Sequence, residues 1–193
     1  MAKRILVIYG HPSKTSLNYS LAEAYCNGAQ NSGHEVKKLV LADMEFEINL
    51  QFGFEKRMEL EQDLKMAQEY ILWAEHLVFV HPVWWGGLPA LFKGFIDRCF
   101  LPGFAFKYRE NSVWWDKLLS GKTAHIITTL DQPGWYYWLM YGRPSVNQLK
   151  KSTLEFCGIN PVKLTYVGAV RGAESKKIKE WIDKAGSLGE DAA

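Results

Sequence analysis

Three segments of the chain carry residue types that could bind a flat ligand bearing an anionic group. Residues 10–18 combine several hydroxyl side chains with a histidine and a lysine. Residues 81–98 contain two tryptophans and two glycines ahead of Pro89, and residues 128–138 place four aromatic residues among turn residues. Aromatic rings suit stacking on a planar ring system, whereas hydroxyls and main-chain amides suit an anion.

The 10–18 segment is predicted to bind a phosphate. It joins an apolar strand to a helix, so helix N-terminal amides, the positive end of the helix dipole and nearby hydroxyl donors would face an anion. The alternative is that Ser13, Thr15 or Ser16 only caps the helix. The segment is not a P-loop, because it lacks the Gly-Lys-Ser/Thr ending.

The 81–98 segment is predicted to form one wall of a ligand pocket. Pro82 ends an apolar strand, and the paired glycines allow a tight turn that brings main-chain amides close to a flat ligand. Trp84 and Trp85 are adjacent in an extended segment, so at least one indole should leave the core side of the sheet and line a cleft. The alternative is that both tryptophans are core residues beneath a loop.

A planar heteroaromatic ring between the second and third segments, with its phosphate in the first, accounts for all three. Flavin has this combination of parts. We therefore expect a flavin, with FMN favoured for this compact chain and FAD as the alternative. Shielding of a dimer contact is a second role for the aromatic residues, and it is compatible with the first.

The order of elements places the three segments at one edge of a sheet. Strands are expected at residues 4–9, 35–40, 77–80, 122–129 and 162–167, and helices at 16–31, 55–73, 89–100, 145–156 and 174–184. Strands that alternate with helices indicate a parallel sheet with right-handed crossovers. Five strands fit a flavodoxin-like, doubly wound α/β fold of order 2-1-3-4-5 with helices on both faces. Ligands of such sheets bind beyond the carboxyl ends of the strands, between the first and third.

The intervening segments are expected to be irregular. Residues 42–54 form an apolar loop over the surface or against a partner, and residues 101–115 form an aromatic, basic loop. Residues 1–193 are expected to make one domain, with a frayed tail at 186–193.

Composition excludes several classes of protein. The net charge is +2 with cations scattered among acids, so no nucleic-acid partner is expected. The three cysteines, Cys26, Cys99 and Cys157, are far apart and are predicted to be buried thiols of a reducing compartment. A cytoplasmic location is expected, because the chain shows neither a leader-like apolar segment nor a run long enough to span a bilayer.

No metal site or nucleophilic triad is expected. The five histidines, His11, His34, His76, His81 and His125, lack metal-ligand spacing. His76 and His125 are predicted to be structural. Asp97 and Arg98 are predicted to pair with neighbouring residues, with contact to the cofactor or to a subunit partner as the alternative for Arg98.

The chain resembles the NAD(P)H quinone dehydrogenase family of flavodoxin-like flavoproteins, which includes bacterial quinone reductases and the ancillary oxidoreductases of potassium efflux systems. The likeness covers nearly the whole chain. It rests on His11-Pro12 with Ser16 and Asn18, on Pro82 to Arg98 with its Lys93-Gly94 pair, on Pro102 to Phe106, on Thr128-Thr129 and on Phe156-Cys157-Gly158.

The resemblance implies a flavin site and an enzyme. His11, Ser16 and Asn18 would hold the flavin phosphate or diphosphate; Pro82, Val83, Trp84 and Trp85 would lie along the isoalloxazine, with Thr128 and Tyr136 on its other side. The implied reaction is ping-pong hydride transfer from NAD(P)H through flavin N5 to a quinone or similar acceptor. Relatives are typically homodimers with the pocket at the subunit interface.

The chain departs from the family in two places. Leu130 and Asp131 follow the paired threonines where familiar members have two glycines, and Gly142-Arg143 stands where many members have a histidine. Negative charge that develops near flavin N1 and O2 must be stabilised by a donor or a cation. Tyr136 or Arg143 is the expected catalytic group.

Two other functions remain as alternatives. One is a flavin-binding regulatory subunit that docks on a membrane potassium efflux system. The other is a one-electron carrier, which the near-neutral charge disfavours because such carriers are usually strongly acidic.

Overall fold

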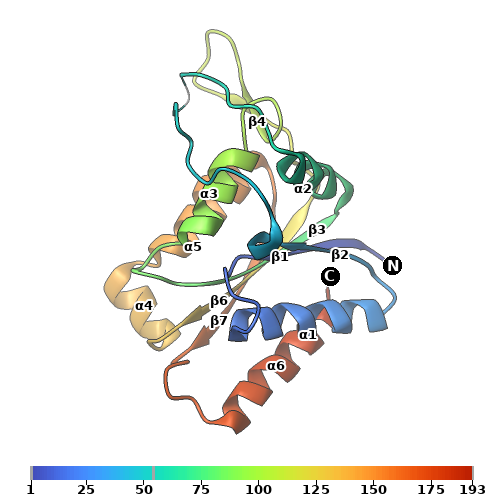
Figure 1. The fold of residues 1–193 in the computed structure, drawn as a ribbon, viewed down its shortest axis with the longest axis vertical. Helices are drawn as coiled ribbons and strands as arrows, with labels where there is room; N and C mark the ends of the chain where they lie inside the picture. The colour runs from blue at the N-terminus through green and yellow to red at the C-terminus, as the bar shows by residue number, and fades with distance from the viewer. Residues whose placement is uncertain (1, 54, 193) are drawn as a thin grey trace.

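Five parallel strands form the central sheet of the computed structural model, which describes residues 2–53 and 55–192 (Figure 1). They are β1 (Arg4–Tyr9), β2 (Glu35–Val40), β3 (His76–Pro82), β6 (Thr123–Leu130) and β7 (Val162–Gly168). Their order is β2-β1-β3-β6-β7, and every neighbouring pair is parallel. Counted along these five strands, the order is 2-1-3-4-5, so the predicted fold is confirmed.

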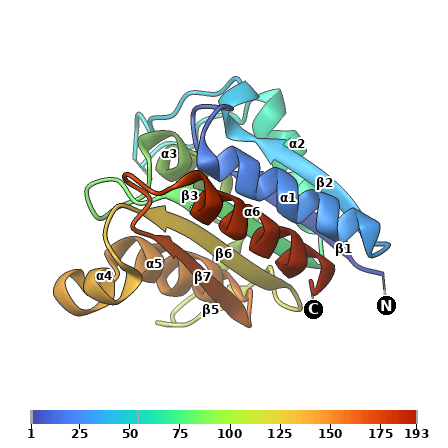
Figure 2. The ribbon, with the colours of Figure 1, turned by 90° about the horizontal axis from the view of Figure 1, so that it is seen from below.

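Helices cover both faces of the sheet. Figure 2 shows α1 (Leu17–Asn31) and α6 (Ser175–Glu190) side by side across one face. The other face carries α2 (Gln62–Trp73), α3 (Ala90–Cys99) and α5 (Pro144–Leu149) (Figure 1). Because both faces are covered, the central strands read as continuous apolar runs rather than as alternating ones.

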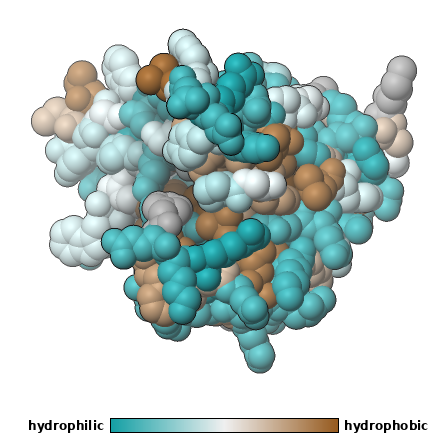
Figure 3. All heavy atoms as spheres, turned by 90° about the horizontal axis from the view of Figure 1, so that it is seen from above, coloured by the Kyte–Doolittle hydropathy of each residue, from teal (hydrophilic) through white to brown (hydrophobic). Residues whose placement is uncertain are grey.

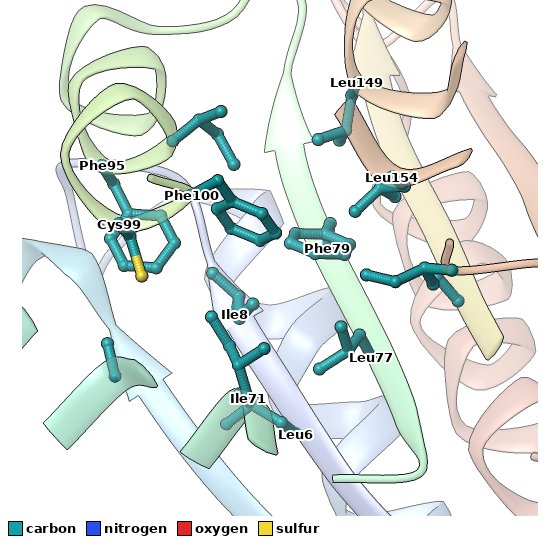
Figure 4. Close-up of a cluster of buried hydrophobic side chains, with 14 of the residues drawn as sticks. Leu6, Ile8, Ile71, Leu77, Phe79, Phe95, Cys99, Phe100, Leu149 and Leu154 are labelled. Carbon is teal, nitrogen blue, oxygen red and sulfur yellow. The ribbon is translucent and has the colours of Figure 1, made fainter. Parts of the chain in front are cut away.

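Each face of the sheet has its own hydrophobic core. Figure 4 shows Leu6, Ile8, Leu77 and Phe79 of β1 and β3 against side chains of the helices on the α2–α3 face. The alternate residues of the same strands pack on α1 and α6. On the face drawn in Figure 3, hydrophobic side chains appear in patches among hydrophilic ones.

Glycines bring α1 and α6 into main-chain contact. A Cβ atom on Gly28 would collide with the carbonyl oxygen of Gly186, and one on Gly189 would collide with that of Tyr25. The predicted frayed tail at 186–193 is therefore wrong for its first part, because α6 continues to Glu190 against α1. Residue 193 lies outside the described residues.

The helix predicted at 55–73 is too long at its start. It begins at Gln62, because the buried guanidinium of Arg98 on α3 holds the preceding segment in an irregular conformation. The Nη atoms of Arg98 donate to the carboxylate of Glu61 at 2.8 Å and to the main-chain oxygen of Glu59 at 2.9 Å. Arg98 also donates to Glu47, so its predicted pairing with neighbours is confirmed.

Part of the predicted 42–54 loop is a short 3₁₀ helix, Leu41–Asp43, and residue 54 lies outside the described residues.

Two further elements were not predicted. A hairpin of β4 (Phe106–Tyr108) and β5 (Trp115–Lys117) lies in the predicted 101–115 loop. A helix, α4 (Gly134–Tyr141), occupies the third aromatic segment. The helix predicted at 145–156 is present as α5 followed by a π-helical segment, Lys150–Glu155.

Buried histidines and cysteines have the structural roles that were predicted. His76 contacts the hydroxyls of Tyr25 and Thr123, and His125 contacts that of Thr165. Burial lowers the pKa of His76 to about 3 and that of His125 to about 4, so both are neutral at pH 7. The three cysteines are free and buried. Among the residues that the structure describes, no helix has both the length and the apolar character needed to cross a membrane.

Candidate functional site

The loop between β1 and α1 presents hydroxyls at a helix N-terminus. The Ser16 hydroxyl accepts the N–H of Tyr19 at 3.2 Å and donates to the carbonyl oxygen of Ser13 at 2.8 Å, so Ser16 caps α1. The hydroxyls of Ser13 and Thr15 are hydrogen-bonded to each other at 3.0 Å. Lys14 forms an ion pair with Asp43. Capping is therefore one role of the loop, and the Thr15 side chain remains exposed.

His11 in this loop is a neutral donor. Its Nδ1 accepts the main-chain N–H of Ser13 at 2.9 Å, and partial burial holds its pKa below the usual value. The ring proton is then on Nε2, where it can be donated to an anion. The His11 ring also lies edge-on to Trp84, with 5.4 Å between ring centroids. The structure thus brings together two residues that were predicted for the phosphate and for the ring system.

Asn18 links the first loop to the third. Its Nδ2 donates to the Thr129 hydroxyl at 3.0 Å, and both side chains are buried. Asn18, which was predicted to bind the phosphate, is therefore hydrogen-bonded to the carboxyl end of β6, and this bond fixes the start of α1 against the sheet.

The two tryptophans lie in a tight turn that points away from the core. The N–H of Trp84 donates to the Gly87 oxygen at 3.1 Å, and that of Gly87 donates to the Trp84 oxygen at 2.9 Å. Trp85 and Gly86 at the centre have φ values of 50° and 76°, as in a type I′ turn. Trp84 is 45% exposed and Trp85 is fully exposed, so the alternative of two core tryptophans is wrong. A bulky residue at positive φ is strained by about 1–3 kcal/mol, and such strain is common at binding sites.

Tyr137 of α4 anchors this turn. Its hydroxyl donates to the Gly86 oxygen at 2.9 Å and accepts the N–H of Ser145 at 3.0 Å, while the Ser145 hydroxyl lies 2.8 Å away. Tyr137 is 2% exposed. The turn is thereby tied to both α4 and α5.

We expect Tyr137→Phe to lower the free energy of unfolding by about 1.5 kcal/mol, because the substitution leaves the half-buried Gly86 oxygen and the buried Ser145 N–H with fewer partners. Urea unfolding followed by circular dichroism measures this change. Tyr108→Phe is the control, because that side chain is 63% exposed. Equal stability of the Tyr137→Phe variant and the wild type would show that the hydroxyl does not anchor the turn.

A cavity of about 400 Å³ lies between the second and third segments, beyond the carboxyl ends of β3 and β6. It is lined by Val83, Trp85, Gly86, Asp131, Gln132, Tyr137 and Tyr141. Its size falls within the range of about 300–1,000 Å³ typical of small-molecule sites. A second cavity, of about 280 Å³, lies against residues 50–53 and 56–58, and of the three segments only Arg98 reaches it.

The remaining predicted residues lie outside the lining of the larger cavity. Thr128 is fully buried, and Pro82 is buried with its oxygen 2.9 Å from His81 Nδ1. Tyr136 is half-buried, with its ring 5.9 Å from that of Tyr141. Arg143 precedes α5 and lies near Tyr166. Burial raises the pKa of Tyr166, and the guanidinium of Arg143 offsets part of that rise.

Sequence reasoning missed Tyr137, Tyr141 and Gln132. Tyr137 and Tyr141 are four residues apart, so they share one face of a helix. That signal was available only if residues 134–141 were first assigned to a helix.

Comparisons with known proteins agree with this architecture. Residues 3–188 match the family described as flavodoxin-like fold. The chain is 30% identical to NAD(P)H dehydrogenase [quinone] 1 of Cavia porcellus, over 85% of this chain and 68% of that protein. It is 29% identical to the ribosyldihydronicotinamide dehydrogenase-like protein traD of Penicillium crustosum, over 68% of this chain but only 58% of that protein.

A solved structure has the same fold. The chain superposes on Smu.1420 from Streptococcus mutans UA159 with a TM-score of 0.84 and 33% identity, covering 97% of this chain and 99% of that one. The chain belongs to the flavodoxin-like fold family and, within it, to the NAD(P)H quinone dehydrogenases.

Proposed function

We propose that this protein is a flavin-dependent NAD(P)H:quinone-type oxidoreductase. The observation that carries the proposal is the cavity of about 400 Å³ at the carboxyl edge of the sheet, with an exposed aromatic turn on one side and a helix N-terminal loop nearby. The relative from Cavia porcellus is named as an NAD(P)H dehydrogenase acting on quinone, which supports the same reaction.

The residues at this edge fit a flavin. The Nε2–H of His11, the Thr15 hydroxyl and the N-terminus of α1 form a donor set suited to a phosphate. Trp84 links this set to the turn, since its ring contacts His11. The cavity is lined by aromatic side chains that suit a planar ring. We favour FMN, with FAD as the alternative.

A bound flavin would supply the two-electron transfer between NAD(P)H and the acceptor. The protein's own residues bind, orient and shield the reactants. Tyr137 holds the Trp84–Gly87 turn in place, and Trp85 and Tyr141 offer aromatic surface on which a planar ring can stack. With a flavin ring also held in this cavity, the two substrates could stack on it only in turn, which is the basis for proposing ping-pong kinetics.

The direct test is to purify the protein, release its cofactor by heat and identify it by mass. We expect one flavin per chain and NAD(P)H-dependent reduction of a neutral naphthoquinone by the loaded protein. A colourless protein that neither FMN nor FAD reconstitutes would contradict the proposal. A regulatory subunit of a membrane efflux system would turn over quinone poorly without its partner, so rapid turnover by this chain alone separates the two functions.

We also propose a cytoplasmic homodimer. The buried free cysteines support a reducing compartment. Val113 and Trp114 at the tip of the β4–β5 hairpin are 86% and 66% exposed, and Phe52 of the 42–54 loop is 47% exposed. Large exposed apolar side chains of this kind are typical of subunit contacts.

Light scattering should therefore give twice the chain mass of 22.1 kDa. Replacing Val113 and Trp114 by glutamate should convert the dimer to monomer, because two charges would be buried in an apolar contact. Leu72→Glu is the control, since Leu72 is an exposed apolar residue on α2. A wild-type mass of 22.1 kDa would contradict the dimer.

A further inference from the structure

Among the residues that the structure describes, one charged side chain lines the cavity of about 400 Å³. It is the carboxylate of Asp131, which follows β6 and lies across the cavity from Trp85 and Gly86. The other six lining residues are a valine, a tryptophan, a glycine, a glutamine and two tyrosines. The charge that a ligand meets in this cavity is therefore set by one residue.

The backbone around Asp131 is fixed on both sides. The preceding residue, Leu130, is 3% exposed, and its oxygen accepts the N–H of Val170 at 3.2 Å. The following residue, Gln132, accepts the N–H of Ala169 at 3.1 Å. The carboxylate is thus held at the cavity by a main-chain segment pinned to the loop after β7.

No neighbouring cation neutralises this carboxylate. Within residues 2–53 and 55–192, Asp131 forms no side-chain hydrogen bond and no ion pair. Of the cations in the loops at this edge of the sheet, Lys14 pairs with Asp43 and Arg143 lies beside Tyr166, whereas Arg171 in the loop after β7 is exposed to solvent. Asp131 is exposed, so water screens its charge strongly, and only a ligand at close range responds to it.

We propose that Asp131 selects the acceptor by charge, so that the cavity favours cationic quinones and disfavours anionic ones. This inference rests on the proposed oxidoreductase function. At about 6 Å and an effective dielectric constant near that of water, about 80, one unit charge changes affinity by about threefold in either direction. A matched pair of cationic and anionic acceptors should therefore differ by about tenfold through Asp131 alone.

The test compares a naphthoquinone bearing a trimethylammonium group with one bearing a sulfonate, each normalised to the unsubstituted quinone. In Asp131→Asn, the ratio of kcat/KM for the cationic over the anionic acceptor should fall about tenfold relative to wild type. The wild-type ratio should also shrink as salt is raised, because ions screen exposed charges. Asp183→Asn on α6 removes the same charge outside the cavity, and it should leave the ratio unchanged.

Quenching of tryptophan fluorescence by the two quinones gives a readout that does not depend on turnover, since Trp85 lines the same cavity. The ratio of their dissociation constants should shift in the same direction in Asp131→Asn. Reduction of all three quinones by wild type with an unchanged ratio in Asp131→Asn would overturn the inference and leave the proposed function standing. Failure of wild type to reduce any of the three would overturn both.

Discussion

Replacing Arg98 by methionine should lower the free energy of unfolding by about 3 kcal/mol. The guanidinium is fully buried on α3 and donates to Glu61 and to the main-chain oxygens of Glu47 and Glu59. Breaking a buried pair by removing one partner typically costs about 3–5 kcal/mol. The lower end applies here, because the Glu61 side chain is 33% exposed and water stabilises it in part.

Urea unfolding measures this loss, and Lys93→Met is the matched control on the same helix. Lys93 pairs with Asp97 four residues away, but both side chains are more than a third exposed, so this pair should contribute less than about 1 kcal/mol. If the two variants are equally stable, Arg98 does not hold the segment before α2 against α3.

Removal of the group that stabilises negative charge on the flavin should slow its reduction by NAD(P)H about a hundredfold. One preorganised donor of this kind is typically worth about 3 kcal/mol. Tyr136 and Arg143 are the proposed groups. Tyr136 directly precedes Tyr137, and Arg143 lies two residues before Ser145; the hydrogen bonds of Tyr137 and Ser145 anchor the aromatic turn. Each is thus attached to a main-chain segment with a fixed position.

Stopped-flow reduction of Tyr136→Phe and Arg143→Ala tests this role. The responsible substitution should also make the midpoint potential of the bound flavin more negative, because the reduced form loses its stabilising partner. Arg171→Ala removes an exposed cation from the loop after β7 and should change neither quantity. Wild-type rates and potentials in both variants would show that neither residue has this role.

The strands could be predicted because buried parallel strands have an unmistakable pattern. Ile5 to Ile8 are fully buried, and their continuous apolar run required cover on both faces. β2 alternates more, and it lies at the edge as expected. Strand order followed from the rules for alternating strands and helices rather than from any single residue.

The helix ends and α4 depended on contacts that local pattern does not encode. Gly28 and Gly186 look like weak helix positions, yet they let α1 and α6 touch and extend α6 past the predicted tail. α4 is apolar on all sides, so it lacks the amphipathic period by which helices are predicted. Its limits are set by Pro133 before it and by Gly142 in a left-handed conformation after it.

The site was predicted at the level of loops more than of side chains. The three segments do meet at one edge, and the Trp84–Gly87 turn does face outward. Asp131 was noticed only as a departure from relatives, and its place on the cavity required the structure. The sequence predicted Tyr136 rather than Tyr137 as the site residue. Which of two adjacent aromatic residues faces the cavity can be judged only when the helix that carries them is known.

The most direct measurement of the central claim is an anaerobic titration of the purified, flavin-loaded protein, followed by its visible absorbance. One equivalent of NAD(P)H should bleach the flavin band, and one equivalent of a neutral naphthoquinone should then restore it without any other protein. A band that NAD(P)H leaves unchanged, or that quinone fails to restore, would contradict the assignment of this chain as an NAD(P)H:quinone-type oxidoreductase.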